Sequence, residues 1–289
     1  MKNVLTLTLI AGTKTCPNDC PICISKMTPS HDIEKARIPI DVVILRKSIQ
    51  FALNHRAQNV LITGKGEPTL YPAQISQYLA ELKGLPFDKR ELQTEGSYIS
   101  REGMTPMLET WRYLDLDYIA ISIYHYNPKL NQEMFRNPYG YSPVDLCIKL
   151  TDMGYRVRLS CVMAQGYIDS IDKVNRLLDY ARECGAIQLS LRTVDCPPNP
   201  VDKTVAKNAR KYRLTDTQYE NIMNHFRKHG IYCDKLPHGA EIWEINGQNI
   251  CITDGLSDDA GKDNIRQLVF FPQGILTSSW VTVNGSRVF

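Results

Sequence analysis

Hydrophobic positions along the chain follow two alternating patterns. Short apolar runs, such as residues 59–63 and 118–123, have the length and composition of buried strands. Between such runs, stretches such as residues 42–52 repeat apolar side chains at the three- and four-residue spacing of an amphipathic helix. Strand–helix units of this kind follow one another six times between residues 4 and 193. Strict alternation predicts an α/β fold, in which helices wrap a parallel sheet.

Two of the predicted strands sort their side chains by face. Apolar residues alternate with polar ones, which are Arg158 and Ser160 on one strand and Ser190 and Arg192 on the next. A sheet covered by helices needs an apolar outer face, so we expect the polar side chains to face the centre of a curved sheet. There the arginines either contact a ligand or pair with core carboxylates, as buried charges usually do.

The pattern changes after residue 193. A proline-rich connector leads to a helix that starts at Thr215 with a capping-box sequence, and the helical period stops at Gly230. Two hairpins are then predicted, with turns at Asn246-Gly247 and Gln273-Gly274. We therefore expect three parts: a barrel core (1–193), a linker and helix (194–230), and a small β-hairpin extension covering the barrel (231–289).

A run of basic residues follows the connector. Such a run forms either a solvated helix face or a lid for an anionic group. Its members are Lys203, Lys207, Arg210, Lys211 and Arg213.

Composition narrows the class of protein. The chain has 289 residues, of which 43% are hydrophobic and 22% are charged, as in a globular protein with ample core. A net charge of +3 is too small to imply binding to nucleic acid or to a membrane. The first apolar run is too short for a signal peptide or a membrane span. Nine cysteines without an export signal indicate a reducing compartment, so we expect a cytoplasmic protein.

Three cysteines lie close together directly after the first predicted strand. Cys16, Cys20 and Cys23 are spaced by four and three residues. A structural zinc site normally closes with four ligands, and no second cysteine pair or histidine pair completes this one. Three thiolates on one loop can instead hold three irons of a [4Fe–4S] cluster, which leaves the fourth iron open to a non-protein ligand.

A second motif, Gly66-Glu67-Pro68, follows the second predicted strand. Together, the Cys-x3-Cys-x2-Cys loop and this motif resemble those of the radical S-adenosylmethionine (SAM) superfamily, and the resemblance covers about residues 4–193. It implies a partial (β/α)6 barrel of the TIM type, a [4Fe–4S] cluster and SAM. It also implies an enzyme that cleaves SAM to a 5′-deoxyadenosyl radical, which takes a hydrogen atom from a small-molecule substrate. The electron would come from a donor of the flavodoxin or ferredoxin type.

The resemblance assigns roles to individual residues. The three cysteines would be the iron ligands, and the Gly-Glu-Pro edge would meet the methionine end of SAM. Ser122, at the end of the fourth strand, matches a position that often meets the ribose. On the fifth strand, Arg158 or Ser160 could contact the SAM carboxylate or ribose.

Two residues depart from the family pattern. Ile22 replaces the aromatic residue usual before the last cysteine, so that adenine packing there must be aliphatic. Lys65 replaces the first glycine of the usual Gly-Gly-Glu-Pro motif, and lysine lacks that glycine's conformational freedom.

Residues 157–194 most resemble the molybdenum-cofactor GTP cyclases and their relatives. Those cyclases carry a second cysteine triad and a terminal Gly-Gly, whereas this chain ends in Ser286-Arg287-Val288-Phe289. We therefore expect a single cluster.

Cys251, in the first predicted C-terminal hairpin, is a candidate catalytic residue. Radical SAM epimerases use a lone cysteine outside the cluster to return a hydrogen atom to the opposite face of the substrate radical. The acidic residues nearby would suit a polycationic substrate such as an aminoglycoside, or another sugar-like molecule. The competing interpretation is a buried strand cysteine beside a solvated acidic turn. The acidic residues are Glu241 and Glu244 in the hairpin and Asp254, Asp258, Asp259 and Asp263 in the loop after it.

Three other functions stay open at this level. One is the radical cyclisation or rearrangement of a nucleotide, which the basic run would favour. Another is the activation of a glycyl-radical partner protein, which needs the same three cysteines. The third is a zinc-binding scaffold without enzymatic activity.

Overall fold

The computed structural model describes residues 2–33, 39–253, 256, 259–281 and 287–288. Its centre is one curved sheet in which the strand order is β13-β12-β2-β3-β4-β5-β6-β7-β10-β9-β8. In the described part of the chain, eight neighbouring strands of this sheet run parallel. They are β12 (Leu268–Phe271), β2 (Thr6–Ile10), β3 (Asn59–Thr63), β4 (Lys89–Thr94), β5 (Tyr118–Ile123), β6 (Arg156–Met163), β7 (Gln188–Thr193) and β10 (Gln248–Thr253).

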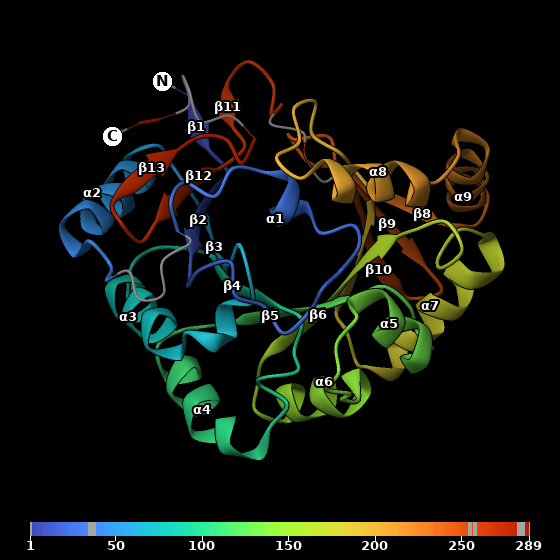
Figure 1. Ribbon diagram of the computed structural model, residues 1–289, viewed down its shortest axis with the longest axis horizontal. Helices are drawn as coiled ribbons and strands as arrows, with labels where there is room; N and C mark the ends of the chain where they lie inside the picture. Colours follow the sequence, from blue (N-terminus) through green and yellow to red (C-terminus); the bar gives the residue numbers. More distant parts are fainter. Residues whose placement is uncertain (1, 34–38, 254–255, 257–258, 282–286, 289) are drawn as a thin grey trace.

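Helices form the outer ring around this sheet (Figure 1). Each connects two parallel strands, as alternating strand–helix units require. They are α2 (Val42–Asn54), α3 (Pro72–Leu82), α4 (Thr105–Tyr113), α5 (Pro128–Phe135), α6 (Pro143–Asp152) and α7 (Ile171–Glu183). The short helix α1 (Ile24–Met27) lies inside the ring of strands in this view. The predicted partial barrel of parallel strands and helices is confirmed.

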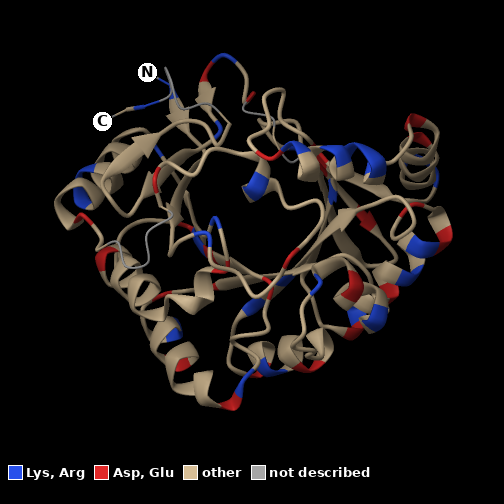
Figure 2. Ribbon diagram, viewed as in Figure 1, with Lys and Arg blue, Asp and Glu red and all other residues tan. Residues whose placement is uncertain are grey.

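Local sequence sets where the helices begin. Asp41 caps α2 by accepting a hydrogen bond from the backbone N–H of Ile44, and Ser142 caps α6 in the same way. Both reciprocal bonds of the capping box predicted at Thr215 are present at the start of α9 (Asp216–His229). The basic run forms α8 (Lys203–Tyr212) and the residue after it, in the outer part of the molecule (Figure 2). Its five charged side chains are exposed. It is a solvated helix face.

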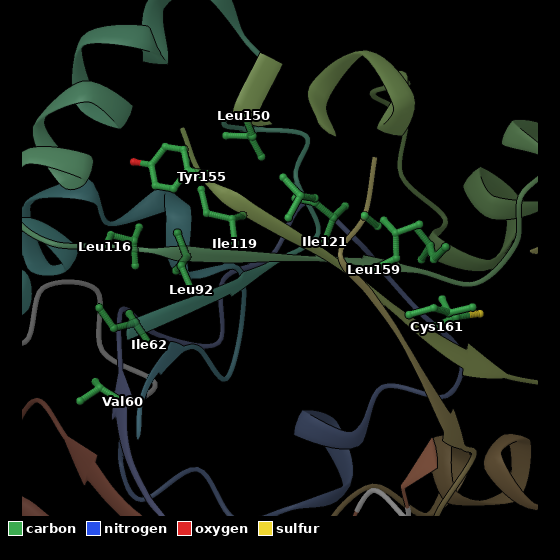
Figure 3. Close-up of a cluster of buried hydrophobic side chains, with 14 of the residues drawn as sticks. Val60, Ile62, Leu92, Leu116, Ile119, Ile121, Leu150, Tyr155, Leu159 and Cys161 are labelled. Atoms are coloured by element: carbon green, nitrogen blue, oxygen red, sulfur yellow. The ribbon is translucent and has the colours of Figure 1, made fainter. Parts of the chain in front are cut away.

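The main core lies between the sheet and the helices. Strand residues such as Ile62, Leu92, Ile121 and Leu159 point outward into it and are fully buried, as Figure 3 shows. The alternate residues of the same strands therefore face the inside of the barrel. This is the sorting of faces that the strand pattern predicts.

The C-terminal segment enters the barrel sheet. We expected an extension lying over the barrel. Instead, β10 pairs in parallel with β7 at one edge, and β12 pairs in parallel with β2 at the other. Both predicted hairpins form, each adding one antiparallel strand outside its parallel one: β9 (Glu241–Ile245) and β13 (Ile275–Thr277). These strands satisfy edges that the six-stranded core would leave unpaired.

The remaining elements are peripheral. Strand β8 (Ile231–Lys235) pairs with β9, and β1 (Asn3–Val4) forms a separate short ladder with β11 (Asn264–Ile265). Two 3-10 turns, η1 (Pro68–Leu70) and η2 (Glu102–Met104), precede α3 and α4. Among the described residues, no helix has the length and apolar character needed to cross a membrane.

Candidate active site

The three-cysteine loop joins the end of β2 to α1 and is anchored on both sides. On one side, the Thr13 hydroxyl lies 2.6 Å from the Tyr71 hydroxyl, and the backbone N–H of Glu67 donates to the Thr15 carbonyl at 3.0 Å. On the other side, the backbone N–H of Asp19 donates to the Phe135 carbonyl at 3.0 Å. The loop is thereby held across the C-terminal ends of the parallel strands, where barrel enzymes carry their chemistry.

The three thiols lie near one another and near two carboxyl groups. Burial raises the pKa of Cys16 to about 12, and the neighbouring Glu67, Cys23 and Glu95 oppose its ionisation further. Burial, with Cys23, also raises the pKa of Cys20 to about 12. Thiols whose anions are disfavoured in this way gain from a cationic metal centre, because the metal favours the thiolate form. Three such thiols on one loop have the chemistry of iron–sulfur ligands, although among the described residues no three potential metal ligands are positioned to hold a metal ion.

The Gly-Glu-Pro edge packs directly against the cysteine loop. A side chain at Gly66 would begin 2.1 Å from the Thr15 carbonyl oxygen, so only glycine fits here. Pro68 is buried at the first position of η1. The motif thus brings the end of β3 into contact with the loop that bears the cysteines.

Glu67 is a buried connector between two strand ends. Its Oε1 accepts hydrogen bonds from the backbone N–H and the hydroxyl of Thr69 and from the Thr94 hydroxyl. Its Oε2 accepts from the backbone N–H of Glu95 at 3.0 Å. Because both of its oxygens accept hydrogen bonds, this side chain links the end of β3 to the end of β4. It thereby fixes the conformation of the Gly-Glu-Pro edge beside the cysteines.

Glu95, which follows the end of β4, is a site residue that was not among the candidates predicted from the sequence. It is 5% exposed, and its pKa is raised to about 7 by burial and by the nearby Glu67. Its Oε1 accepts a hydrogen bond from the backbone N–H of Ser97. The carboxyl group also acts electrostatically on Cys16. Its position at the C-terminal end of a parallel strand is the signal that could have identified it.

Lys65, which replaces a glycine of the family motif, is also buried. Its ammonium group donates to the Thr28 hydroxyl at 2.7 Å and lies 4.4 Å from the centre of the Trp280 ring. Burial lowers its pKa to about 7. The lysine therefore links the β3 end to α1 and to the C-terminal segment, contacts that no local pattern indicates.

A cavity of about 880 Å³ occupies the inside of the barrel. The polar faces of β4, β6, β7 and β10 line it, and Lys89, Glu91, Arg158 and Ser190 are among the lining residues. Arg158 donates hydrogen bonds to Glu91, Gln188 and Ser190, and the ion pair with Glu91 bridges β6 and β4. For Arg158, the alternative of pairing with a core carboxylate is therefore confirmed.

Cys251 lines the same cavity. It lies on β10 opposite Ser190, which pairs with Ser160, which in turn pairs with Ser122. These four residues form one row across four adjacent strands, facing the inside of the barrel. Cys251 is 7% exposed, and burial raises its pKa although Arg158 and Arg192 partly oppose the shift. The structure thus places Cys251 in one register row with the predicted SAM-contacting Ser160 and Ser122, which lie two and three strands away.

Of the six acidic residues expected near Cys251, Asp254 and Asp258 lie outside the described residues. Neither Asp259 nor Asp263 lines the cavity. The other nearby carboxylates, Glu241 and Glu244, lie on β9, outside β10. The described part of this segment gives the cavity no acidic wall.

A comparison with protein-family models identifies the family of this chain. The model of the radical SAM superfamily matches residues 10–181, which is more than half of the chain. The chain belongs to the radical SAM superfamily. It is a radical SAM enzyme, and the cofactors of its family are a [4Fe–4S] cluster and SAM.

Solved structures of other radical SAM enzymes share the fold. SuiB from Streptococcus suis, bound to S-adenosylmethionine, is similar with a TM-score of 0.64 and 15% identity, over 99% of this chain and 63% of that one. The native anSMEcpe with bound AdoMet has a TM-score of 0.58 and 12% identity, over 98% of this chain and 77% of that one. Methylornithine synthase (PylB) has a TM-score of 0.52 and 14% identity, over 77% of this chain and 62% of that one. This radical SAM protein therefore spans less than two thirds of the SuiB chain. A search of curated proteins finds no significant match.

Proposed function

We propose that this enzyme abstracts a hydrogen atom from a small molecule bound in the barrel cavity, and that Cys251 returns a hydrogen atom to the substrate radical. The reaction would be an epimerisation of a sugar-like molecule. The observation that carries this proposal is the position of Cys251 in the cavity wall, in one row with Ser122, Ser160 and Ser190.

In this proposal Cys16, Cys20 and Cys23 hold three irons, and the edge formed by Gly66, Glu67 and Pro68 borders the methionine end of SAM. When bound, the cluster and SAM supply a 5′-deoxyadenosyl radical; the protein's part is to position the reactants and exclude water. Ser122 and Ser160 have hydroxyls suited to the ribose. Arg158 is engaged by Glu91, so its contribution is to hold Ser190 and the cavity wall in place.

Cys251 has the protonation state that hydrogen-atom donation needs. Its raised pKa keeps the sulfur as a thiol at neutral pH, so an S–H bond is available. In the step, the S–H bond breaks, a C–H bond forms on the substrate, and a thiyl radical stays on the cysteine. One electron and one proton then restore the thiol, and a flavodoxin- or ferredoxin-type donor could supply the electron.

Replacement of Cys251 with alanine tests the proposal. The reduced enzyme is incubated in D₂O with SAM and a polar metabolite extract, and the products are examined by mass spectrometry. Wild-type enzyme should place one deuterium in an isomerised product, whereas Cys251→Ala should still form 5′-deoxyadenosine but lose the deuterated isomer. Cys233→Ala, which changes an exposed cysteine on β8, is the matched control and should behave like wild type. Unchanged product formation by Cys251→Ala would rule out this role.

Radical cyclisation or rearrangement of a nucleotide is the second candidate. The basic residues of the cavity favour it, because they suit phosphate groups. Cys251 would then have no part in turnover, and the alanine variant would keep full activity. Activation of a glycyl-radical partner needs only the cysteine loop, and formation of 5′-deoxyadenosine on small molecules alone counts against it.

The remaining expectations about cellular context are also proposals. We propose a cytoplasmic enzyme that acts on small molecules and not on nucleic acid or membranes. Its support is the state of the nine cysteines, all of which are free in the structure.

A further inference from the structure

The charges that line the barrel cavity are strongly unequal. Among the described lining residues, one is a carboxylate, Glu91, whereas five are basic. The basic residues are Arg56, Lys89, Arg158, Arg192 and Arg266. A cavity with this lining holds a positive potential, which is poorly suited to a polycationic substrate.

The one carboxylate of the cavity lining is already paired with cations. Glu91 forms ion pairs with both Lys89 and Arg158, and the two partners hold its pKa down at about 2. Arg158 also has Gln188 and Ser190 as hydrogen-bond acceptors. The group formed by Glu91, Lys89 and Arg158 therefore has a net charge of +1, and its carboxylate is fully occupied by these two cations.

Arg192 is a half-buried cation without a partner among the described residues. It lies on β7, lines the cavity, and makes no hydrogen bond or ion pair with the described residues; its Nε is buried. Burial lowers its pKa, and the nearby Arg158 and Arg266 lower it further. Glu91 and Cys251 raise the pKa, but by less than the other three effects lower it. Its Nε is shielded from water without a hydrogen-bond acceptor, so an anion placed beside this guanidinium in the cavity would stabilise it.

His238 is a second cavity residue near Arg192 that could interact with an anion. His238, in the loop between β8 and β9, also lines the cavity, and burial, Arg266 and Arg192 together lower its pKa to about 4. An anion at this point would contact one guanidinium and an imidazole able to take up a proton. Arginine binds carboxylate and phosphate through two parallel hydrogen bonds, which fixes the orientation of the bound group.

We propose that Arg192, with His238 beside it, is the anchoring site for a carboxylate or phosphate group of the substrate. This inference deepens the proposed function and rests on it. Arg192 pairs in register with Thr253, two residues beyond Cys251 on β10, or about 7 Å along the strand. A small anionic substrate anchored at Arg192 therefore extends its carbon skeleton past the Cys251 thiol. The substrate class becomes an anionic, sugar-sized molecule in place of an aminoglycoside.

Anion binding without turnover tests this site. The cluster-loaded enzyme is titrated calorimetrically with inorganic phosphate and, separately, with acetate. Wild type should bind at least one of the two, and Arg192→Gln should weaken that binding tenfold or more. Arg192→Lys, which keeps the charge, should retain most of it. Arg210→Gln, which removes an exposed charge on α8, is the matched control and should bind like wild type. Tighter binding of phosphate would assign a phosphorylated substrate, and tighter binding of acetate would assign a carboxylate.

Two results would overturn the proposal. One is equal anion binding by wild type and by an Arg192→Gln variant that still melts cooperatively. The other is full displacement of the anion by SAM, which would assign Arg192 to the carboxylate of the cofactor. Cys251→Ala should bind the anion like wild type, because the thiol is not part of the anchor. If Cys251 proved to have no catalytic role, the anion-binding result at Arg192 would still stand. If Arg192 proved not to bind anions, the role of Cys251 would likewise be unaffected.

Discussion

At the scale of single residues, Gly66 is the point where the two motifs of the site touch. Its Cα hydrogen faces the Thr15 carbonyl, one residue before the first cysteine. Gly66→Ala should displace the cysteine loop and lower both stability, by about 1–3 kcal/mol, and iron content. Urea unfolding and iron analysis after anaerobic reconstitution measure the two effects. Gly103→Ala is the control, because a methyl group there meets no atom within 4 Å. Full iron loading of Gly66→Ala would contradict this account.

His238 provides a pH-dependent contribution to stability. Its pKa is about 4 in the folded protein and near 6.5 in the unfolded chain, so the unfolded chain takes up a proton first as the pH falls. Stability should therefore decrease below pH 6.5 and continue to decrease toward pH 4. Because the side chain is only partly buried, we expect a loss of about 1 kcal/mol between pH 7.5 and 5.5.

Urea unfolding of the holoenzyme at these two pH values measures the effect. His238→Asn should remove this part of the pH dependence, whereas His229→Asn, at an exposed position on α9, should keep it. Saturating phosphate should reduce the loss in wild type if the anion binds beside His238, since the folded protein would then take up the proton as well. A pH dependence that is the same in all three proteins would exclude His238 as its source.

At the scale of elements, an ion pair spans three strands. Glu91 on β4 and Arg158 on β6 meet across β5, where Ala120 is the register partner of Arg158 and leaves room for the long side chain. Glu91→Gln should cost about 3–5 kcal/mol, because it leaves Arg158 buried without its anion. The double variant Glu91→Gln/Arg158→Gln should lose less than the sum of the two single variants.

Urea unfolding of the two single variants and the double variant completes this cycle. Arg176→Gln, which breaks an exposed ion pair with Asp172 on α7, is the control and should cost less than about 1 kcal/mol. Strictly additive losses in the cycle would show that the two charges do not stabilise each other.

Elements with local signals could be predicted from the sequence. The caps at Asp41, Ser142 and Thr215 and the alternating faces of β6 and β7 depend only on neighbouring residues, and so does the cysteine spacing. The parallel pairing of β10 with β7 could not be predicted, because turn residues specify only the antiparallel partner within each hairpin. For the same reason, nothing in the sequence indicated that His238 and Arg192 share one cavity, since about forty-five residues separate them. The family motifs predict where the cofactor site lies, whereas the proposed substrate site depends on tertiary pairing that no local pattern indicates.

At the scale of the whole molecule, the C-terminal segment completes the barrel on both sides. Strand β12 is wholly buried against β2, with Leu268, Val269, Phe270 and Phe271 inaccessible to solvent, and β10 supplies Cys251 to the cavity. Removing residues 231–289 would expose the edges of β2 and β7 together with this apolar surface. Each fully buried side chain of this size contributes about 1.5–3 kcal/mol, so the loss from these four alone is comparable with the whole stability of a typical domain.

We therefore expect that a fragment of residues 1–230 does not fold, although it contains every residue of the cysteine loop and the Gly-Glu-Pro motif. Circular dichroism, thermal melting and iron analysis should show no cooperative transition and little bound iron. A chain ending at residue 281 is the matched control: it keeps both hairpins and should melt cooperatively and take up iron. If the 1–230 fragment melted cooperatively and bound four irons, the radical-generating barrel would be separable from the strands that form the substrate cavity. Failure of the fragment would mean that the cofactor site and the substrate site fold as one unit, because the sheet that carries the cysteine loop needs the strands that carry Cys251.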